Sequence, residues 1–205
     1  SQKDKHKPQK TPLWKYQKQN RSIVPAPTAT QILHAAGIAF ACKLRKAPIV
    51  TIAYCSDDTT AEADFLEGIH FAAQHQLPVI FICEQDCSPN DTHPPHIQGI
   101  ELPVGLTHQR VDGCDIVTVY TAMQHAMQHA RSGQGPILLE MSVTRLDPPS
   151  QVQQDDEASN DPLTRCQHYL LTHDLWDETW AQELHTLFSM EVERAMQDAL
   201  RDGLI

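Results

Sequence analysis

The stretch YCSDDTTAEADFLEGIHFAAQHQLPVIFICEQDCS, from Tyr54 to Ser88, decides the fold. It predicts the end of a β-strand, an acidic turn, an amphipathic helix and a second buried strand that ends in another acidic turn. Asp57 and Asp58 follow the first strand, and Glu84 and Asp86 close the second. Because open α/β sheets bind their ligands at the carboxyl ends of parallel strands, these acids mark the edge where a ligand site is expected.

The alternation of helix and strand continues on both sides of this stretch. Continuous apolar runs such as APIVTIAY and GPILLEMSV are typical of strands buried on both faces, and the segments between them repeat apolar residues at helical spacing. The pattern predicts an α/β fold with a parallel sheet and helices on both faces. The expected strands are residues 49–54, 78–83, 107–111 and 136–143, and the expected helices are residues 28–46, 60–76 and 115–133.

The chain is expected to have four segments. Residues 1–22 read as a flexible N-terminal tail rich in lysine and glutamine, and residues 23–150 as the α/β domain. Residues 151–160, QVQQDDEASN, are polar and poor in helix formers, so a loop is expected there. Residues 161–205 contain two helices, which we expect to pack on the domain or on a partner subunit, because the last helix is apolar on one face.

Composition and charge narrow the class of protein. The chain has 205 residues, of which 40% are hydrophobic and 20% charged, and its formal net charge is -10. We expect no membrane span, because no apolar run is long enough, and no nucleic acid partner, because phosphate binding needs a basic surface. The six cysteines have no CxxC spacing, so we expect reduced thiols and a cytoplasmic or mitochondrial matrix protein.

Several blocks taken together carry a resemblance to a known family. TATQILHAAG, SDDTTAEADFLEGIHFAA, PVIFIC, RVDGCD, GPILLEMSVTRL and DPLTRCQHYLLTHDLWDE follow one another in this order within roughly residues 12–200. The chain thereby resembles the alpha subunit of thiamine-diphosphate-dependent 2-oxo acid dehydrogenases, nearest the branched-chain type. The resemblance implies the pyrophosphate-type α/β fold of thiamine enzymes and a beta subunit that completes each site of a heterotetramer. The long helical N-terminal part usual in that family does not precede these blocks, so we expect a shortened chain or one piece of a split subunit.

The resemblance also assigns residues to a cofactor site. The family's metal carboxylate falls on Asp57, its ligand asparagine on Asp86 and a backbone carbonyl ligand on Ser88, a set of hard oxygen donors suited to Mg²⁺ or Ca²⁺. A potassium-binding turn beside the cofactor falls on Pro27, Thr30 and Gln31. The positions assigned to thiamine diphosphate itself are Ser56, Asp57, Asp58, Thr59, Glu84 and Arg145.

Some of these positions depart from the family pattern. Ser56 and Asp58 stand where the family has glycines that let the backbone approach phosphate, and Glu84 stands where branched-chain members have an arginine. A carboxylate about 6 Å from a phosphate charge costs about 3 kcal/mol at an effective dielectric near 20. We therefore expect the chain to hold a divalent cation better than it holds thiamine diphosphate.

The loop that is catalytic in the family also departs from the family pattern. TRLDPPS keeps Arg145, Leu146 and Ser150 of the family's loop, but Pro149 takes the place of the histidine that works beside the thiamine ring. A proline side chain neither donates nor accepts a proton. The resemblance therefore implies either an alpha-subunit-like component that takes part in oxidative decarboxylation of a 2-oxo acid, or a catalytically inactive homologue (a pseudoenzyme) that acts as a scaffold or regulatory subunit.

Simpler interpretations remain open for individual residues. Asp57 and Asp58 suit the N-terminal turn of a helix, where the helix dipole favours acids. In AMQHAMQHA, His125 and His129 lie one helical turn apart, which is more typical of a solvated helix face than of a metal site.

A zinc site is the weaker alternative. His93 and His96, in HPPH, follow Cys83 and Cys87 closely enough to suggest shared ligation. Their spacing fits no strong zinc template, and proline-rich loops often expose histidines.

Overall fold

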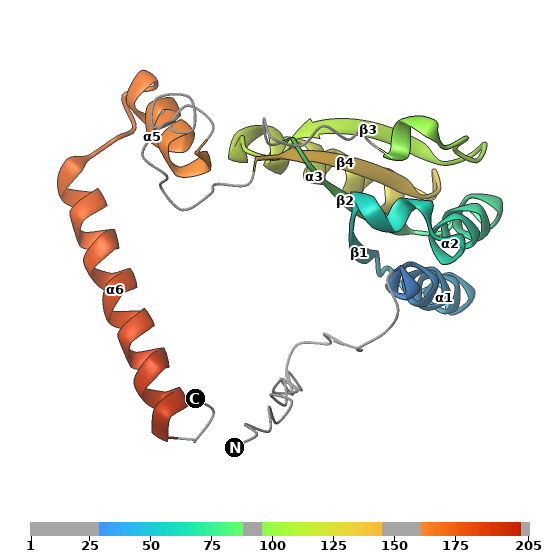
Figure 1. Cartoon of the computed structure of the whole chain (residues 1–205), viewed down its shortest axis with the longest axis horizontal. Coiled ribbons are helices and arrows are strands. Elements are labelled where there is room, and N and C mark those ends of the chain that lie inside the picture. The colour runs from blue at the N-terminus through green and yellow to red at the C-terminus, as the bar shows by residue number, and fades with distance from the viewer. Residues whose placement is uncertain (1–28, 88–95, 145–160, 202–205) are drawn as a thin grey trace, which may run out of the picture. The chain divides into compact units, whose positions relative to one another are not determined.

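The computed structural model describes residues 29–87, 96–144 and 161–201 (Figure 1). The chain divides into two compact units, Ala26–Asp174 in one and Leu175–Ile205 with Ser1–Pro25 in the other. The predicted tail over residues 1–22 and the predicted loop over residues 151–160 lie outside the described residues. The sheet and the helices that cover it belong entirely to the Ala26–Asp174 unit.

Four parallel strands form the sheet of this unit. They are β1 (Thr51–Ser56), β2 (Val79–Asp86), β3 (Thr107–Asp112) and β4 (Ile137–Val143), in the order β1-β2-β4-β3. Every neighbouring pair is parallel, so the polar residues that follow the strands meet at one edge of the sheet. The predicted parallel α/β sheet is confirmed.

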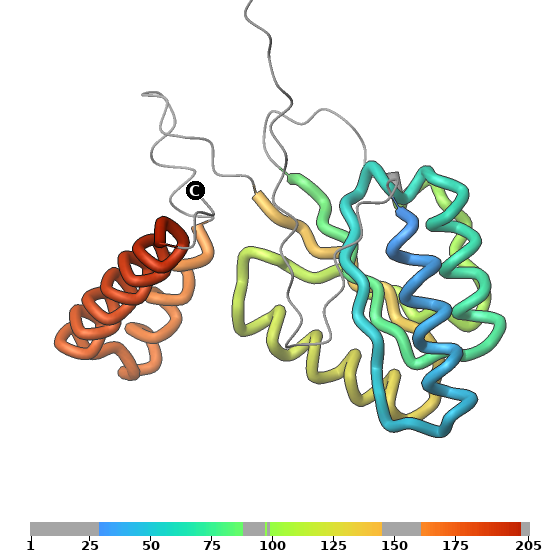
Figure 2. The backbone as a smooth tube through the Cα atoms, turned by 90° about the horizontal axis from the view of Figure 1, so that it is seen from below, coloured from blue at the N-terminus to red at the C-terminus, as the bar shows by residue number. Residues whose placement is uncertain are grey.

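Helices cover both faces of the sheet, also as predicted (Figure 2). Successive residues of a strand point to opposite faces. Phe81 accordingly joins a core formed with α1 (Thr30–Leu44) and α2 (Ala63–Gln74), whereas Ile82 joins a core formed with α3 (Ile116–Arg131). A strand buried from both sides needs apolar residues at every position, which is why the sequence shows continuous apolar runs.

The first two helices approach closely because small residues line their contact. Ala35, Ala36 and Ala39 of α1 are buried, and a Cβ atom added at Gly68 of α2 would lie 2.7 Å from Cγ2 of Ile32. A larger residue at position 68 would therefore push the two helices apart. This contact fixes α2, and with it the acidic turn before α2, against α1.

The first two strands run further toward their carboxyl ends than the apolar pattern predicts. The first ends at Ser56 rather than at residue 54, and the second continues to Asp86 rather than to residue 83. The ladder explains the second difference, because Glu84 and Asp86 remain paired in register with Met141 and Val143 of β4. The acids expected in a turn after β2 therefore lie within the strand itself.

Two helices follow the sheet, at the positions expected. The first, α5 (Pro162–Thr172), belongs to the Ala26–Asp174 unit, and α6 (Glu178–Arg201) belongs to the other unit. None of the residues of α6 is buried. No helix in the described ranges is both long enough and apolar enough to cross a membrane.

Candidate site at the carboxyl ends of the strands

The acidic turn after β1 is a short 3-10 helix, η1 (Asp57–Ala61). Two threonines close it, because the Thr59 hydroxyl donates to the Ser56 carbonyl at 2.7 Å and the Thr60 hydroxyl donates to the Asp57 carbonyl at 2.7 Å. Both threonines are buried, and Asp57 and Asp58 occupy the first turn. The alternative interpretation of these acids as the first turn of a helix describes this local geometry.

Side chains fill the place where the resemblance predicts glycines. The Ser56 hydroxyl donates a short hydrogen bond to Oδ1 of Asp58, and both residues are exposed at the surface. This hydrogen bond holds the Asp58 carboxylate against the turn. The turn thus presents a serine hydroxyl and a carboxylate at its surface, where the resemblance predicts two residues without side chains.

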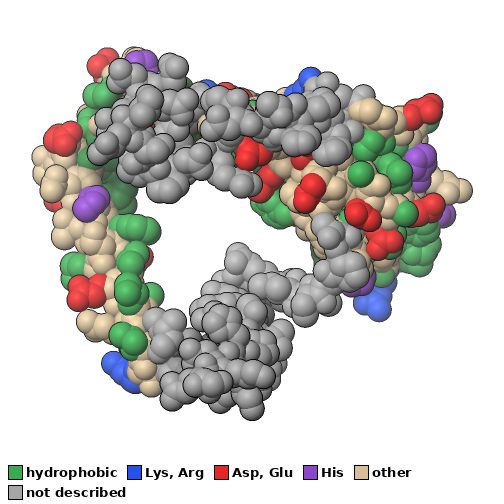
Figure 3. Space-filling view, viewed as in Figure 1, with side chains coloured by type: hydrophobic (Ala, Val, Ile, Leu, Met, Phe, Trp, Pro, Cys, Tyr) green, Lys and Arg blue, Asp and Glu red, His purple; other side chains and the backbone are tan. Residues whose placement is uncertain are grey.

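The register of the sheet brings the two acidic segments to the same edge. Ser56 pairs with Glu84, and η1 contacts β2. Asp57 and Asp58 therefore lie beside the strand that carries Glu84 and Asp86. Acidic side chains are also prominent on the visible face of this unit in Figure 3. A cation is favoured at this edge, and an anion is disfavoured.

A small cavity opens beside Glu84, on the side of the sheet that α3 covers. Its volume is about 160 Å³. The Glu84 carboxylate is exposed and gives an otherwise apolar cavity a negative wall. The lining residues are Tyr54, Ile82, Glu84, Gly113, Val119, Met123, Met141 and Val143.

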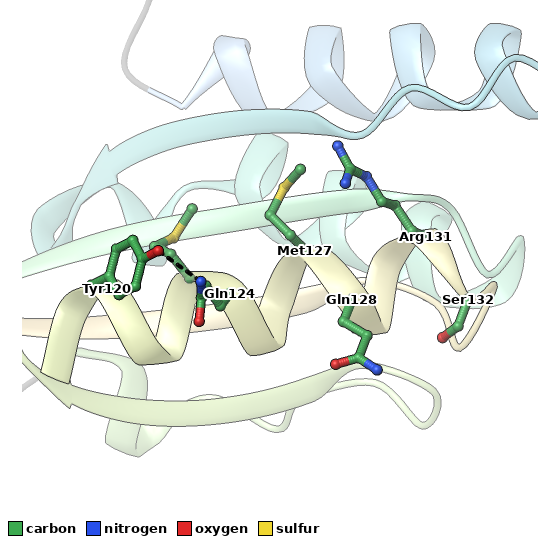
Figure 4. A pocket seen from close by; sticks show the side chains of 7 residues that line it. Tyr120, Gln124, Met127, Gln128, Arg131 and Ser132 are labelled. Carbon is green, nitrogen blue, oxygen red and sulfur yellow. Dashed lines mark hydrogen bonds between the residues drawn. The ribbon is translucent and has the colours of Figure 1, made fainter. Parts of the chain in front are cut away.

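A larger and more open groove of about 780 Å³ runs along α3. Figure 4 shows its lining side chains, with the Gln124 amide donating to the Tyr120 hydroxyl at 2.8 Å. The lining residues are Tyr120, Met123, Gln124, Met127, Gln128, Arg131 and Ser132. These side chains include no carboxylate, histidine or cysteine, and the Ser132 hydroxyl donates to the His129 carbonyl at 2.8 Å, so the groove shows no paired acid and base.

The two described residues of the predicted potassium turn tie α1 to its neighbours. The Thr30 hydroxyl donates to Oδ2 of Asp64 at 3.2 Å, and the Gln31 amide donates to the Tyr54 carbonyl at 3.3 Å. The first contact joins α1 to α2, and the second joins α1 to β1. Pro27, the third residue of that turn, lies outside the described residues.

Several other predicted positions also fall outside the described ranges. They are Ser88, His93, Arg145 and Pro149, together with the side chain of His96. Among the residues that are described, no group of at least three His, Cys, Asp or Glu side chains is arranged to hold a metal ion. Asp57 and Asp86 are thus the described members of the predicted divalent metal site, which stays a prediction.

The two histidines of the duplicated AMQHAMQHA segment lie near each other on α3. The ring centroids of His125 and His129 are 6.3 Å apart, and Nε2 of His129 is 3.3 Å from the Thr107 hydroxyl. That contact ties α3 to β3, which favours a structural role for His129.

A buried carboxylate lies in the row of the sheet just before the row of Glu84. Glu140 of β4 is only 1% exposed, and its Oε2 accepts hydrogen bonds from Nε2 of His108 at 2.8 Å and Nε of Arg110 at 3.1 Å. In sequence it is a lone acid inside the apolar run GPILLEMSV. Since buried carboxylates are rare without partners, that isolated acid was the available signal for a buried ion pair.

Two buried thiols continue the same row across the sheet. Cys55 pairs in register with Cys83, and Cys83 pairs with Glu140. The hydrogen bond between the two thiols and the burial of the site hold the pKa of Cys83 well above its usual range. The same hydrogen bond lowers the pKa of Cys55, because Cys83 donates to the Cys55 sulfur.

A bidentate ion pair anchors α5 to the carboxyl end of β3. Nη1 and Nη2 of Arg165 lie 3.1 and 2.8 Å from the two carboxylate oxygens of Asp112. Asp115, which caps α3 by accepting from the backbone N–H of Val117 and Thr118, lies 3.6 Å from the same guanidinium. The hydrogen bonds from Arg165 lower the pKa of Asp112.

A parallel sheet with helices on both faces defines the α/β class of proteins, in which ligands bind at the carboxyl ends of the strands. Within this class, the family described as "Dehydrogenase E1 component" matches residues 1–204, so the chain belongs to that family. This assignment agrees with the resemblance that the sequence blocks carry.

Curated relatives are named as alpha subunits of 2-oxo acid dehydrogenases. The chain is 33% identical over 202 residues to the 2-oxoisovalerate dehydrogenase subunit alpha of Bacillus subtilis, covering 87% of this chain and 61% of that protein. It is 32% identical over 193 residues to the 3-methyl-2-oxobutanoate dehydrogenase subunit alpha of Mycobacterium tuberculosis, covering 86% and 52%. It is 31% identical over 186 residues to the pyruvate dehydrogenase E1 component subunit alpha of Staphylococcus aureus, covering 82% and 50%. The chain thus spans between 50% and 61% of the length of these relatives.

Proposed function

We propose that this chain is an alpha-subunit-like component of a 2-oxo acid dehydrogenase assembly of the branched-chain type. The reaction of that assembly is the thiamine-diphosphate-dependent oxidative decarboxylation of a 2-oxo acid, and a beta subunit completes each site. The family match over residues 1–204 supports this function. The observation that carries it is the carboxylate of Asp57 at the carboxyl end of β1, next to the strand that carries Asp86.

The chemistry of the acidic edge fits a divalent cation. Asp57 and Asp86 offer carboxylate oxygens, which Mg²⁺ and Ca²⁺ prefer as ligands. The backbone carbonyl of Ser88 is proposed as a further donor. A divalent cation bound there would neutralise part of the local negative charge and could bridge the protein to an anionic group.

Potassium is proposed to bind near Thr30, Gln31 and Pro27. The Thr30 hydroxyl uses its proton in the bond to Asp64, which leaves its oxygen lone pairs directed elsewhere. Such a site would stabilise the start of α1 rather than take part in the reaction.

The pyrophosphate of the cofactor does not fit the same residues. The hydrogen bond from Ser56 fixes the Asp58 carboxylate at the turn, and Glu84 places a second exposed carboxylate beside it. Both charges repel phosphate. This observation favours the second candidate function, a catalytically inactive homologue that acts as a scaffold or regulatory subunit through contacts with a beta subunit or with itself.

Calorimetric titration of the full chain in the presence of Mg²⁺ tests whether the charges of Asp58 and Glu84 weaken cofactor binding. We expect weak binding of thiamine diphosphate by the unaltered chain. A variant with Asp58→Gly and Glu84→Arg should bind at least about tenfold more tightly, because relieving both repulsions is worth more than 1.4 kcal/mol. Glu67→Arg, a charge reversal at an exposed position on α2, is the matched control and should leave the affinity unchanged.

The same samples are then mixed with a beta subunit of the branched-chain type and assayed for decarboxylation of 3-methyl-2-oxobutanoate. Turnover by the unaltered chain would establish the enzyme and reject the inactive homologue. Stable association without turnover would establish the scaffold. Failure of the double variant to gain affinity would show that charge at Asp58 and Glu84 is not what weakens cofactor binding.

A further inference from the structure

The row of the sheet just before the acidic edge places two cysteines on neighbouring strands, in register and on the same face. Cys55 of β1 and Cys83 of β2 are in-register partners, and both side chains join the core on the α1 and α2 side of the sheet. Cys55 is 6% exposed and Cys83 is 0% exposed, so both thiols lie inside that core. The chain therefore holds two sulfur atoms side by side at a defined place in the ladder.

The spacing of the strands is close to what a disulfide requires. Neighbouring strands lie about 4.8 Å apart, which falls within the range of roughly 4.4–6.8 Å between the Cα atoms of bridged cysteines. The Cβ atoms of a disulfide are about 3.8 Å apart, so the strands have to approach each other by about 1 Å at this row. A bond formed in this way is strained and easily reduced.

The first strand can make that small movement at an edge of the sheet, where one of its faces is exposed. Among the described strands β1 pairs with β2 alone, so it forms one edge of the sheet. The side chains of Ile52 and Tyr54, which point away from the thiols, are 42% and 60% exposed. A shift of β1 toward β2 therefore disturbs no packed layer on that face.

We propose that Cys55 and Cys83 form a reversible intrachain disulfide when the protein meets hydrogen peroxide. Peroxide first oxidises the Cys55 thiol to a sulfenic acid, and one water molecule leaves. The Cys83 sulfur then attacks the Cys55 sulfur, the S–S bond forms and a second water molecule leaves. Two thiols are oxidised and one peroxide is reduced. Cys55 is the entry point because its side chain is 6% exposed, whereas Cys83 has no exposed surface.

Geometry excludes the nearest alternative bridge. Cys87 is four residues beyond Cys83 along the extended chain at the end of β2, which separates their Cα atoms by about 13 Å. A bridge between those two residues would require β2 to unfold. Cys87 is nevertheless exposed, so it reports whether peroxide has reached the protein.

The bond would act on the acidic edge directly above it. Ser56 and Glu84 are the next pair in the register, so drawing Cys55 toward Cys83 brings the turn after β1 closer to Glu84. In the oxidised chain the carboxylates of the turn after β1 then lie closer to the carboxylate of Glu84. This consequence does not depend on the proposed function, because it follows from the ladder alone.

Peptide mapping of the full chain tests the proposal. The protein is treated with peroxide, denatured, alkylated and digested both with trypsin and with a protease that cleaves after glutamate. No Lys or Arg lies between Lys46 and Arg110, but cleavage after Glu62, Glu67 and Glu84 places Cys55, Cys83 and Cys87 in three different peptides. We expect residues 47–62 to be linked to residues 68–84, and the link to disappear on treatment with dithiothreitol.

Variants and one internal control complete the test. Cys83→Ala should abolish the link and leave Cys55 as a sulfenic acid that dimedone traps, and Cys87→Ala should leave the link unchanged. If Cys83→Ala does not fold, the presence or absence of the linked peptide in the unaltered chain and in Cys87→Ala still shows whether Cys55 and Cys83 form a disulfide. Oxidation of Cys87 while Cys55 and Cys83 both remain alkylated, or a link that involves Cys87 instead, would overturn the proposal.

Discussion

Replacing Arg110 by methionine tests whether the buried carboxylate of Glu140 depends on its arginine. The change keeps a long apolar side chain and removes the guanidinium, which is 3.1 Å from Oε2 of Glu140. His108 remains as a second partner at 2.8 Å. Because Glu140 is 1% exposed, the variant leaves a buried carboxylate with one donor fewer.

The expected loss of stability follows from these numbers. Removing one partner of a fully buried ion pair costs about 3–5 kcal/mol. The side chain of Arg110 is 56% exposed, and His108 continues to donate to Glu140. We therefore expect Arg110→Met to lower the free energy of unfolding by about 1.5–3 kcal/mol, the contribution of a single hydrogen bond to a charged group. Arg110→Lys, which keeps a positive charge but not the Nε donor, is the matched control and should lose less.

Chemical denaturation of Arg110→Met, Glu140→Leu and the double variant provides the measurement. The single arginine change leaves a buried charge with one partner, whereas the double change leaves no charge to satisfy. We therefore expect the double variant to be more stable than the sum of the two single losses by at least about 1 kcal/mol. Additive losses, or a loss below about 0.5 kcal/mol for Arg110→Met, would refute the view that this pair is coupled in the core.

Further changes test the packing around the sheet. Arg165→Met should remove the stabilisation that the ion pair with Asp112 supplies. Because the hydrogen bond from Arg165 lowers the pKa of Asp112 in the folded chain, this stabilisation is present above about pH 4 and is lost as the pH falls below that value. Thermal melts between about pH 7 and pH 3 should show less pH dependence in the variant, by under about 1 kcal/mol because the pair is exposed. Gly68→Ala should lower the melting temperature through overpacking worth about 1–3 kcal/mol, while Gly37→Ala, whose Cβ meets nothing within 4 Å, should not. Asp115→Ala should cost about 1 kcal/mol in urea unfolding by removing the cap of α3, and Asp115→Asn should restore most of it.

The order of apolar runs and helical segments was enough to predict the parallel sheet and the faces that helices cover. Each buried strand has to be apolar throughout, and each covering helix repeats with its own period. The ends of the strands were not predictable in the same way. Glu84 and Asp86 look like turn residues, yet their pairing with β4 keeps them in the ladder, and pairing with a distant segment leaves no mark on the local sequence.

The candidate site likewise has features that the sequence predicts and features that it does not. Acids after two successive strands predict an acidic edge, because parallel strands end together. The hydrogen bond between Ser56 and Asp58 could not be predicted, since it depends on the conformation of η1. The contact of Glu140 with Arg110 could not be predicted either, because β4 lies between β2 and β3 and the strand order does not follow the sequence order.

Neighbouring rows of the ladder explain why one acid is buried and another is exposed. Glu140 pairs in register with Arg110, and its charge is compensated inside the sheet. In the next row Glu84 lies between Ser56 and Met141, neither of which carries a charge, and its carboxylate is exposed at the small cavity beside α3. The negative charge of Glu84 is therefore not compensated by its neighbours in the ladder and acts on whatever approaches the carboxyl ends of the strands. A cation gains from this charge and a phosphate loses, because the register places no positively charged residue beside Glu84.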